Sequence, residues 1–146
     1  MAMSRRKELE DIIIGTLLES TMEESYYDDV KSCITEDMIQ DSMNRRIFRM
    51  VSEMNAKGKK DTTPTAIFEE YGDVVMDILP DIVDKAVDKS FVWLKCKHNE
   101  EQFLSSLETG YKPKYTYVEF SDYVGAFIKL YNEEEYNIKR GDNVAA

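Results

Sequence analysis

The sequence contains few of the residues on which cross-links, metal centres and catalytic triads depend. Its 146 residues include only two cysteines and one histidine. Cys33 and Cys96 lie far apart in the chain, so no disulfide framework is predicted, and this cysteine usage favours a reducing cytoplasm. His98 forms an isolated Cys-x-His pair with Cys96, whereas structural zinc takes four ligands and a catalytic histidine needs an orienting partner. No metal, cofactor or triad is predicted.

Long apolar runs and a phosphate-binding loop are also absent from the sequence. No stretch approaches the ~20 apolar residues that span a bilayer, and Ile12–Ile14 is too short for a signal peptide. A phosphate-binding loop requires Gly-x-x-x-x-Gly-Lys-Ser/Thr. Around Gly58, the first glycine is replaced by Glu53 and the hydroxyl residue by Lys60. An ATP-driven motor is therefore excluded, and no membrane association is expected.

Positive charge is in the minority, with 19 Lys and Arg against 29 Asp and Glu and a net charge of −10. Because nucleic acid is itself densely negative, direct DNA binding is expected to be weak or absent. Four aspartates recur near helical spacing over residues 77–88, but Lys85 and Lys89 interleave with them, which predicts a solvated, ion-paired face. Residues 133–135 are three consecutive glutamates, interpreted as exposed helix surface. An enzyme with a carboxylate site has no support in this spacing, so no enzyme is predicted.

The residues that are present favour helices. With three prolines, six glycines and 42% hydrophobic residues, the chain is predicted to be all-α: a compact orthogonal bundle followed by a helical hairpin or a long C-terminal helix. Four segments are expected from this pattern: a helical globule over 1–72, a helical extension over 73–114, an amphipathic helix over 115–140 and a tail over 141–146. Pro80 is expected to break or restart a helix, and residues 91–94 are assigned to a helix because no partner strand is evident.

Residues 43–71 show the strongest local pattern, that of a helix, a turn and a second helix. Apolar residues at helical spacing are followed by Gly58, which can adopt the left-handed conformation that ends a helix, and by the Thr63-Pro64 start of the next helix. The basic residues of this segment are interpreted either as solvated surface or as a surface for an acidic partner, the candidates being Arg45, Arg49, Lys59 and Lys60. A small helical DNA-binding regulator that uses this helix–turn–helix is the alternative function. Salt-steep binding to duplex DNA would favour that alternative.

The order of several short motifs resembles the N-terminal domain of DnaB-type replicative helicases. The similar residues are Asn44-Arg45-Arg46-Ile47-Phe48, then Gly58, Asp61, Thr65 and Phe68, and upstream Glu8, Ile14, Gly15, Leu18 and the turn Thr35-Glu36-Asp37-Met38. The match covers residues 8–68, with a weaker similarity at 115–138. Four positions depart from the family: Asn44 replaces His, Met38 replaces Phe, Thr62 replaces a small apolar residue, and Ala66-Ile67 stands at the usual Leu.

The resemblance implies a non-catalytic interaction and oligomerisation module of the DNA replication machinery, without the helicase motor. In that family such domains stack as dimers into a ring and receive primase or a helicase loader. They also carry a helical hairpin through which subunits pair, for which residues 115–138 and the segment around 81–107 are the candidate arms.

The C-terminal helix carries an aromatic stripe that is the candidate surface for self-association. The stripe consists of Phe120, Tyr123, Phe127, Ile128 and Tyr131. A helix that projects from a globule cannot cover its own apolar stripe, and an uncovered stripe of this size marks an association surface, so a homodimer or higher oligomer is expected. The alternative is that the stripe belongs to the intramolecular core.

Overall fold

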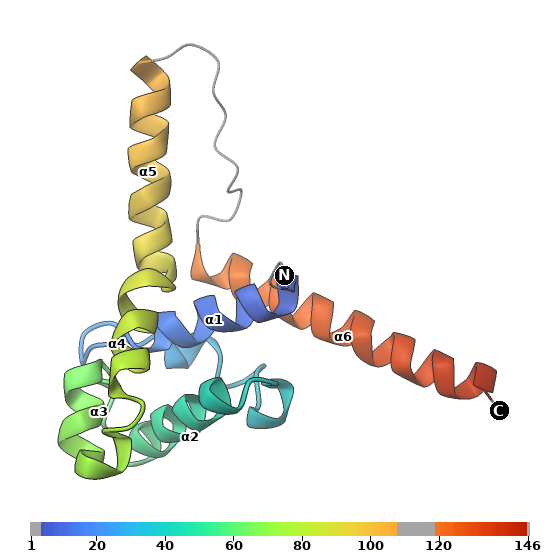
Figure 1. The fold of residues 1–146 in the computed structure, drawn as a ribbon, viewed down its shortest axis with the longest axis horizontal. Helices are drawn as coiled ribbons and strands as arrows, with labels where there is room; N and C mark the ends of the chain where they lie inside the picture. Colours follow the sequence, from blue (N-terminus) through green and yellow to red (C-terminus); the bar gives the residue numbers. More distant parts are fainter. Residues whose placement is uncertain (1–3, 108–118, 146) are drawn as a thin grey trace.

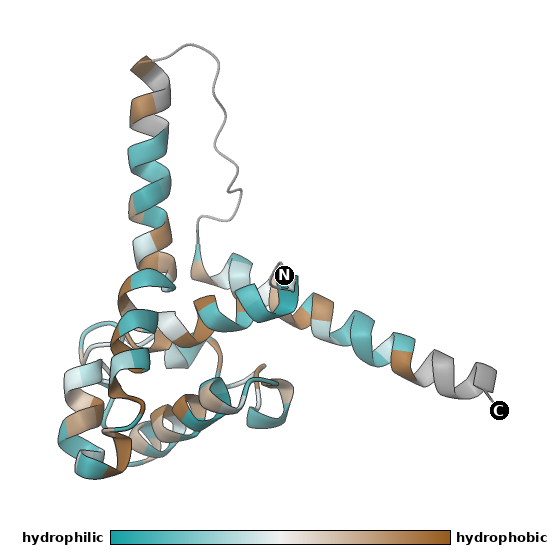
Figure 2. Cartoon of the chain, viewed as in Figure 1, coloured by the Kyte–Doolittle hydropathy of each residue, from teal (hydrophilic) through white to brown (hydrophobic). Residues whose placement is uncertain are grey.

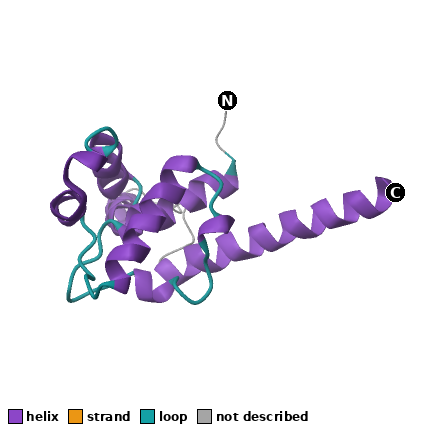
Figure 3. Cartoon of the chain, turned by 90° about the horizontal axis from the view of Figure 1, so that it is seen from below, coloured by secondary structure: helices purple, strands orange, loops and turns teal. Residues whose placement is uncertain are grey.

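The computed structural model describes residues 4–107 and 119–145, and in these ranges the chain forms helices and loops without a strand (Figure 1, Figure 3). The predicted all-α class is confirmed. The elements in chain order are α1 (Arg5–Leu17), η1 (Tyr27–Asp29), η2 (Glu36–Met38), α2 (Ser42–Ala56), α3 (Pro64–Tyr71), η3 (Gly72–Val75), α4 (Leu79–Asp88), α5 (Phe91–Leu107) and α6 (Phe120–Ala145). The end of the predicted extension and the start of the predicted amphipathic helix, residues 108–118, lie outside the described residues. Among the helices of residues 4–107 and 119–145, none combines the length and apolarity needed to cross a membrane.

Helix α1 is the central element, and other helices pack around it. Ser4 caps its first turn by accepting a hydrogen bond from the backbone N–H of Lys7 (3.1 Å). Every residue from Leu9 to Leu17 is buried, including charged ones, because α2, α4, α5 and α6 all contact this helix. Its apolar residues Leu9, Ile12, Ile13 and Leu17 are all buried.

The helix–turn–helix of residues 43–71 forms as the sequence predicts. Asp41 caps α2 by accepting from the backbone N–H of Asn44 (3.0 Å), and Gly58 follows the helix with φ +80°. Thr63 then accepts from the backbone N–H of Ala66, and Pro64 is the first residue of α3, where its missing N–H leaves no hydrogen bond unmade. Local chemistry therefore fixes both helices before any tertiary contact is considered.

The predicted boundary at residue 72 does not separate two cores. Pro80 lies in the first turn of α4, as expected, and residues 91–94 are helical. However, Ile82 on α4, Phe91 on α5 and Phe127 on α6 belong to the same buried cluster as the apolar residues of α1 and α2. Residues that were assigned to an extension therefore complete the globule, because α4, α5 and α6 cover sides of α1 that α2 does not.

The long C-terminal helix is present, but the hairpin alternative is wrong for the described residues. Helices α5 and α6 meet at their first turns, where the rings of Phe91 and Phe120 stack with centroids 5.7 Å apart, and then diverge (Figure 1). Helix α6 packs instead along α1, and Figure 2 shows apolar residues interspersed with polar ones along this helix. It continues to Ala145, beyond the predicted tail boundary at residue 141.

Candidate interaction surface and the buried polar cluster

Most of the predicted self-association stripe lies inside the protein. Phe120, Tyr123 and Phe127 are 4%, 3% and 1% exposed. The ring of Phe120 also meets Tyr26 edge to face, with centroids 5.6 Å apart. These three residues are therefore not available to a second subunit, and their assignment to a subunit interface is corrected. The reason is that α1 covers this stripe, which the sequence alone could not show.

The remaining two members of the stripe, Ile128 and Tyr131, are half-buried against the core. Tyr131 faces the guanidinium of Arg6, whose Cζ lies 5.3 Å from the ring centroid. Ile128 lies at the edge of the stripe. One side of its helical turn faces the core and the other side faces solvent.

The predicted basic partner surface is already paired within the chain. Arg45 donates from Nε and Nη2 to the carbonyl of Ile39, at 2.9 and 2.7 Å. The other three cations form ion pairs: Arg49 with Glu36, Lys59 with Glu70, and Lys60 with Asp28 at 3.2 Å. The hydrogen bond from Arg49 lowers the pKa of Glu36, as expected for a charged pair. These residues therefore link the helices and turns to one another and do not form an uncompensated basic patch.

A buried polar cluster joins α1 to its neighbours. The carboxylate of Glu10 accepts hydrogen bonds from the backbone N–H groups of Gln40 and Asp41 and from Nδ2 of Asn44, each at 3.0 Å. Asn44 is 0% exposed and its Nδ2 also donates to Asp11 at 2.9 Å. Glu10 thus holds the start of α2 against α1.

Asp11 supplies the second half of this cluster and reaches α4. Its Oδ1 accepts from Nζ of Lys7 at 2.6 Å and from Nζ of Lys85 at 3.1 Å. Burial alone would raise the pKa of Asp11, but the hydrogen bonds from Asn44 and Lys7 and the charge of Lys85 outweigh it and hold this pKa below 3.8. Burial likewise opposes the charge of Lys7, yet the contact with Asp11 raises the Lys7 pKa above 10.5. Each charge in the pair stabilises the other.

The hydrogen bonds and ion pairs of this cluster join α1 to α2 and α4. The hollow beside Glu10 is otherwise lined by apolar side chains and has no room for a water molecule. Within residues 4–107 and 119–145, no group of three or more His, Cys, Asp and Glu is arranged to hold a metal ion. Both cysteines are free and exposed.

The Asp11 pairing predicts how stability depends on pH. Because the folded-state pKa lies below the unfolded value of 3.8, the stabilisation is fully present above that value and is lost as pH falls through the folded-state pKa. We expect the free energy of unfolding from denaturant titrations to fall between about pH 5 and about pH 2, and to fall less steeply in Asp11→Asn. Asp84→Asn, an exposed aspartate on α4, is the matched control. An equally steep decline in Asp11→Asn would contradict this assignment.

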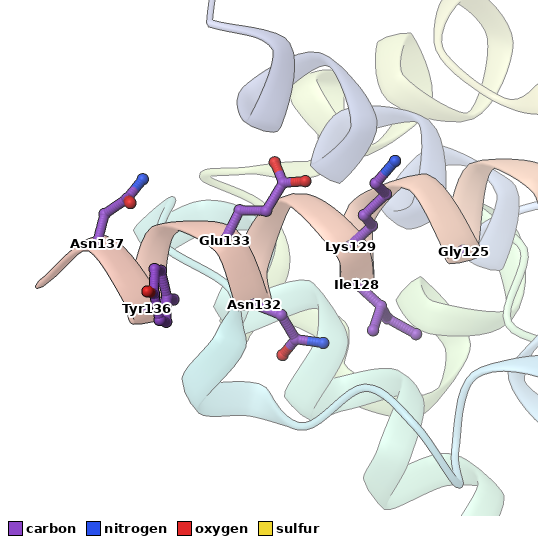
Figure 4. Close-up of a pocket in the computed structure, with 7 residues that line it drawn as sticks. All are labelled: Gly125, Ile128, Lys129, Asn132, Glu133, Tyr136 and Asn137. Carbon is purple, nitrogen blue, oxygen red and sulfur yellow. The ribbon is translucent and has the colours of Figure 1, made fainter. Parts of the chain in front are cut away.

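The outward side of α6 carries a broad strip that is open to solvent. Its lining residues all come from this helix: Gly125, Ile128, Lys129, Asn132, Glu133, Tyr136 and Asn137 (Figure 4). In Figure 4, Ile128, Asn132 and Tyr136 point to one side of the helix, while Lys129 and Glu133 point to the other. Tyr136 is 63% exposed, and a Cβ added at Gly125 would meet nothing within 4 Å. This strip, which we call the α6 outer face, remains accessible after the aromatic stripe has been buried.

The sequence did not identify Glu10, Asp11 and Asn44 as members of a buried cluster, because acidic and amide side chains usually lie at the protein surface. One signal was available: Glu10 and Asp11 interrupt an apolar run, between Leu9 and Ile12, in a helix that is buried on all sides. Charges in such a helix must be paired.

No family model, no curated protein and no solved structure matches this chain. The similarity to DnaB-type N-terminal domains therefore depends on the motif residues alone, and the function is argued from the surface described above.

Proposed function

We propose that this protein is a non-catalytic helical interaction and oligomerisation module, and that it pairs with a second copy of itself through the α6 outer face. The observation that carries the proposal is the exposure of this strip on a helix whose opposite side is anchored in the core. Its place in the DNA replication machinery, with primase or a helicase loader as a partner, is proposed from the motif resemblance.

A second copy is the occupant that the residues of the α6 outer face favour. In an antiparallel pair of α6 helices centred near Tyr131, Tyr136 of one chain lies over Gly125 of the other, where an open glycine leaves room for a ring. The same register brings Lys129 close to Glu133 of the second copy, and both residues are exposed. The same strip therefore carries both members of each contact: Gly125 leaves room for the ring of Tyr136, and Lys129 pairs with Glu133. An isologous interface requires this self-complementarity.

The expected dimer is weak. Residues 125–136 span roughly 18 Å of helix at 1.5 Å per residue, which is short for an interface that must bury at least about 1,200 Å² to be stable. We therefore expect dissociation constants in the range of about 10–100 μM, at the weak end of specific association.

Sedimentation velocity over a concentration series tests the pairing. The unaltered chain is expected to shift from monomer to dimer, whereas Tyr136→Ala should remain monomeric, because it removes the ring that fills the space above Gly125. Lys129→Glu should weaken the dimer by placing like charges together, and Lys129→Glu combined with Glu133→Lys should restore it. Met22→Ala, at another exposed apolar side chain, is the control and should dimerise normally.

A strict monomer at high concentration, or unchanged dimerisation in Tyr136→Ala, would overturn the self-pairing. The replication role has a separate test, titration of the full chain with a purified primase helicase-binding domain and with a helicase loader. Binding to neither protein would count against that role while leaving the dimer intact. Duplex DNA is expected to bind weakly or not at all, because the basic residues of 45–60 are already paired.

A further inference from the structure

The three consecutive glutamates of α6 have different environments. Glu133 is exposed, whereas Glu134 is half-buried and forms an ion pair with Arg6 of α1, 128 positions earlier in the chain. The sequence interpretation of 133–135 as uniform exposed surface is therefore wrong for Glu134 and Glu135, which are both half-buried. Glu134 lies on the side of α6 that faces the start of α1.

Arg6 is held on several sides. Its side chain is 7% exposed, and its Nη2 donates to the carbonyl of Met38 at 2.8 Å. The guanidinium lies 5.9 Å from the ring centroid of Phe127 and 5.3 Å from that of Tyr131. Its Nε is buried with no hydrogen-bond partner. A cation in this setting depends on the charge of Glu134, since a buried charge without a counter-ion is strongly destabilising.

The pair lies at the point where α6 leaves the globule. Phe127 is 1% exposed, whereas Tyr136 and Ile138 are 63% and 58% exposed. Glu134 is seven residues beyond Phe127, which is about 10 Å along the helix. A rod fixed at one end can swing about that end, whereas a second attachment about 10 Å away fixes its direction.

We propose that Arg6 and Glu134 form a clasp that sets the direction in which the C-terminal part of α6 leaves the globule. Arg6 is a positioning residue in this arrangement: it touches no partner and acts by aiming the helix. The clasp is independent of the proposed self-pairing, because it is made within one chain. It also provides a release point, since any change that removes the charge of Glu134 leaves α6 fixed up to Phe127 and held beyond it only by the half-buried side chains of Ile128 and Tyr131.

A distance measurement in the monomer tests the clasp. Spin labels on the native, exposed Cys33 and on Asn137→Cys, with Cys96→Ser and Tyr136→Ala to give two labels and no dimer, report the position of the helix end by pulsed electron resonance. Glu134→Gln should broaden the distribution and displace its maximum by about 5 Å, the motion at Asn137 for a swing of roughly 20° about Phe127. Glu133→Gln and Glu135→Gln change one charge at neighbouring positions and should leave the distribution as it was.

Arg6→Met removes the other member of the ion pair and should broaden the distance distribution in the same way. Circular dichroism establishes that each labelled variant is folded. Equal distributions in Glu134→Gln and the two neighbouring variants would overturn the clasp, and so would equal broadening in all three. A loss of thermal stability without a change in distance would assign Glu134 a purely structural role and would also overturn it. Because Tyr136→Ala is present throughout, failure of the clasp and failure of the dimer are distinguishable.

Discussion

Replacing Asp11 with alanine is expected to lower the free energy of unfolding by about 3–5 kcal/mol, the usual cost of removing one partner from a buried ion pair. Asp11 is 4% exposed and accepts hydrogen bonds from Lys7, Asn44 and Lys85. Without its carboxylate, the ammonium of Lys85, whose side chain is 12% exposed, has lost its counter-ion in a place that water reaches poorly. Urea denaturation at neutral pH, followed by helical ellipticity, measures the change.

The control for this variant is Asp84→Ala on α4, an exposed aspartate. It removes the same group from the surface and should change stability by less than about 0.5 kcal/mol. If Asp11→Ala and Asp84→Ala had the same effect, the cluster around Asp11 would not contribute to the stability of the fold.

Gly15→Ala is expected to destabilise the protein by about 1–3 kcal/mol, although alanine is the better helix former. A Cβ built on Gly15 would lie 2.6 Å from the carbonyl oxygen of Lys85 and 2.9 Å from the backbone N of Ser90. Both neighbours are backbone atoms, one in the last turn of α4 and the other in the turn between α4 and α5, so they cannot rotate away as a flexible side chain would. The helix can accept the methyl group only if α1 moves away from this turn.

Gly125→Ala on α6 provides the matched helical glycine. Nothing lies within 4 Å of its added Cβ, so this variant should be neutral or more stable by about 0.4–1 kcal/mol, because alanine restricts the unfolded chain. Thermal denaturation at low protein concentration compares the two variants in the monomer. Equal melting temperatures would contradict the close approach at Gly15.

The parts of the fold that could be predicted from sequence are those set by local chemistry. The Gly58 stop and the Thr63-Pro64 start lie where the sequence placed them, because a left-handed glycine and an N-terminal cap act within a few residues. The apolar face of α2, with Ile47 and Val51 at 0% exposure, follows from helical spacing for the same reason.

Predictions that depended on tertiary contacts between helices and loops were less successful. The aromatic stripe of α6 was correctly placed on one face of a helix, but no local pattern indicates that α1 covers it. Likewise, the charges of Arg49 and Lys59 suggest a binding surface until Glu36 and Glu70 are found beside them. The sequence marks Glu10 only by its place within an apolar run, and it gives no such sign for Asn44, since the roles of both depend on contacts 30 or more residues apart.

The central position of α1 has a consequence for how the chain folds during synthesis. Helix α1 is synthesised before the helices that pack around it, and part of its apolar surface is covered by Phe120 to Phe127, which are translated more than a hundred residues later. At about 5–20 residues per second, the nascent chain therefore spends several seconds with that surface open. Completion of the core awaits the arrival of α6, and until then a nascent α1 is a natural target for chaperones that recognise apolar helices.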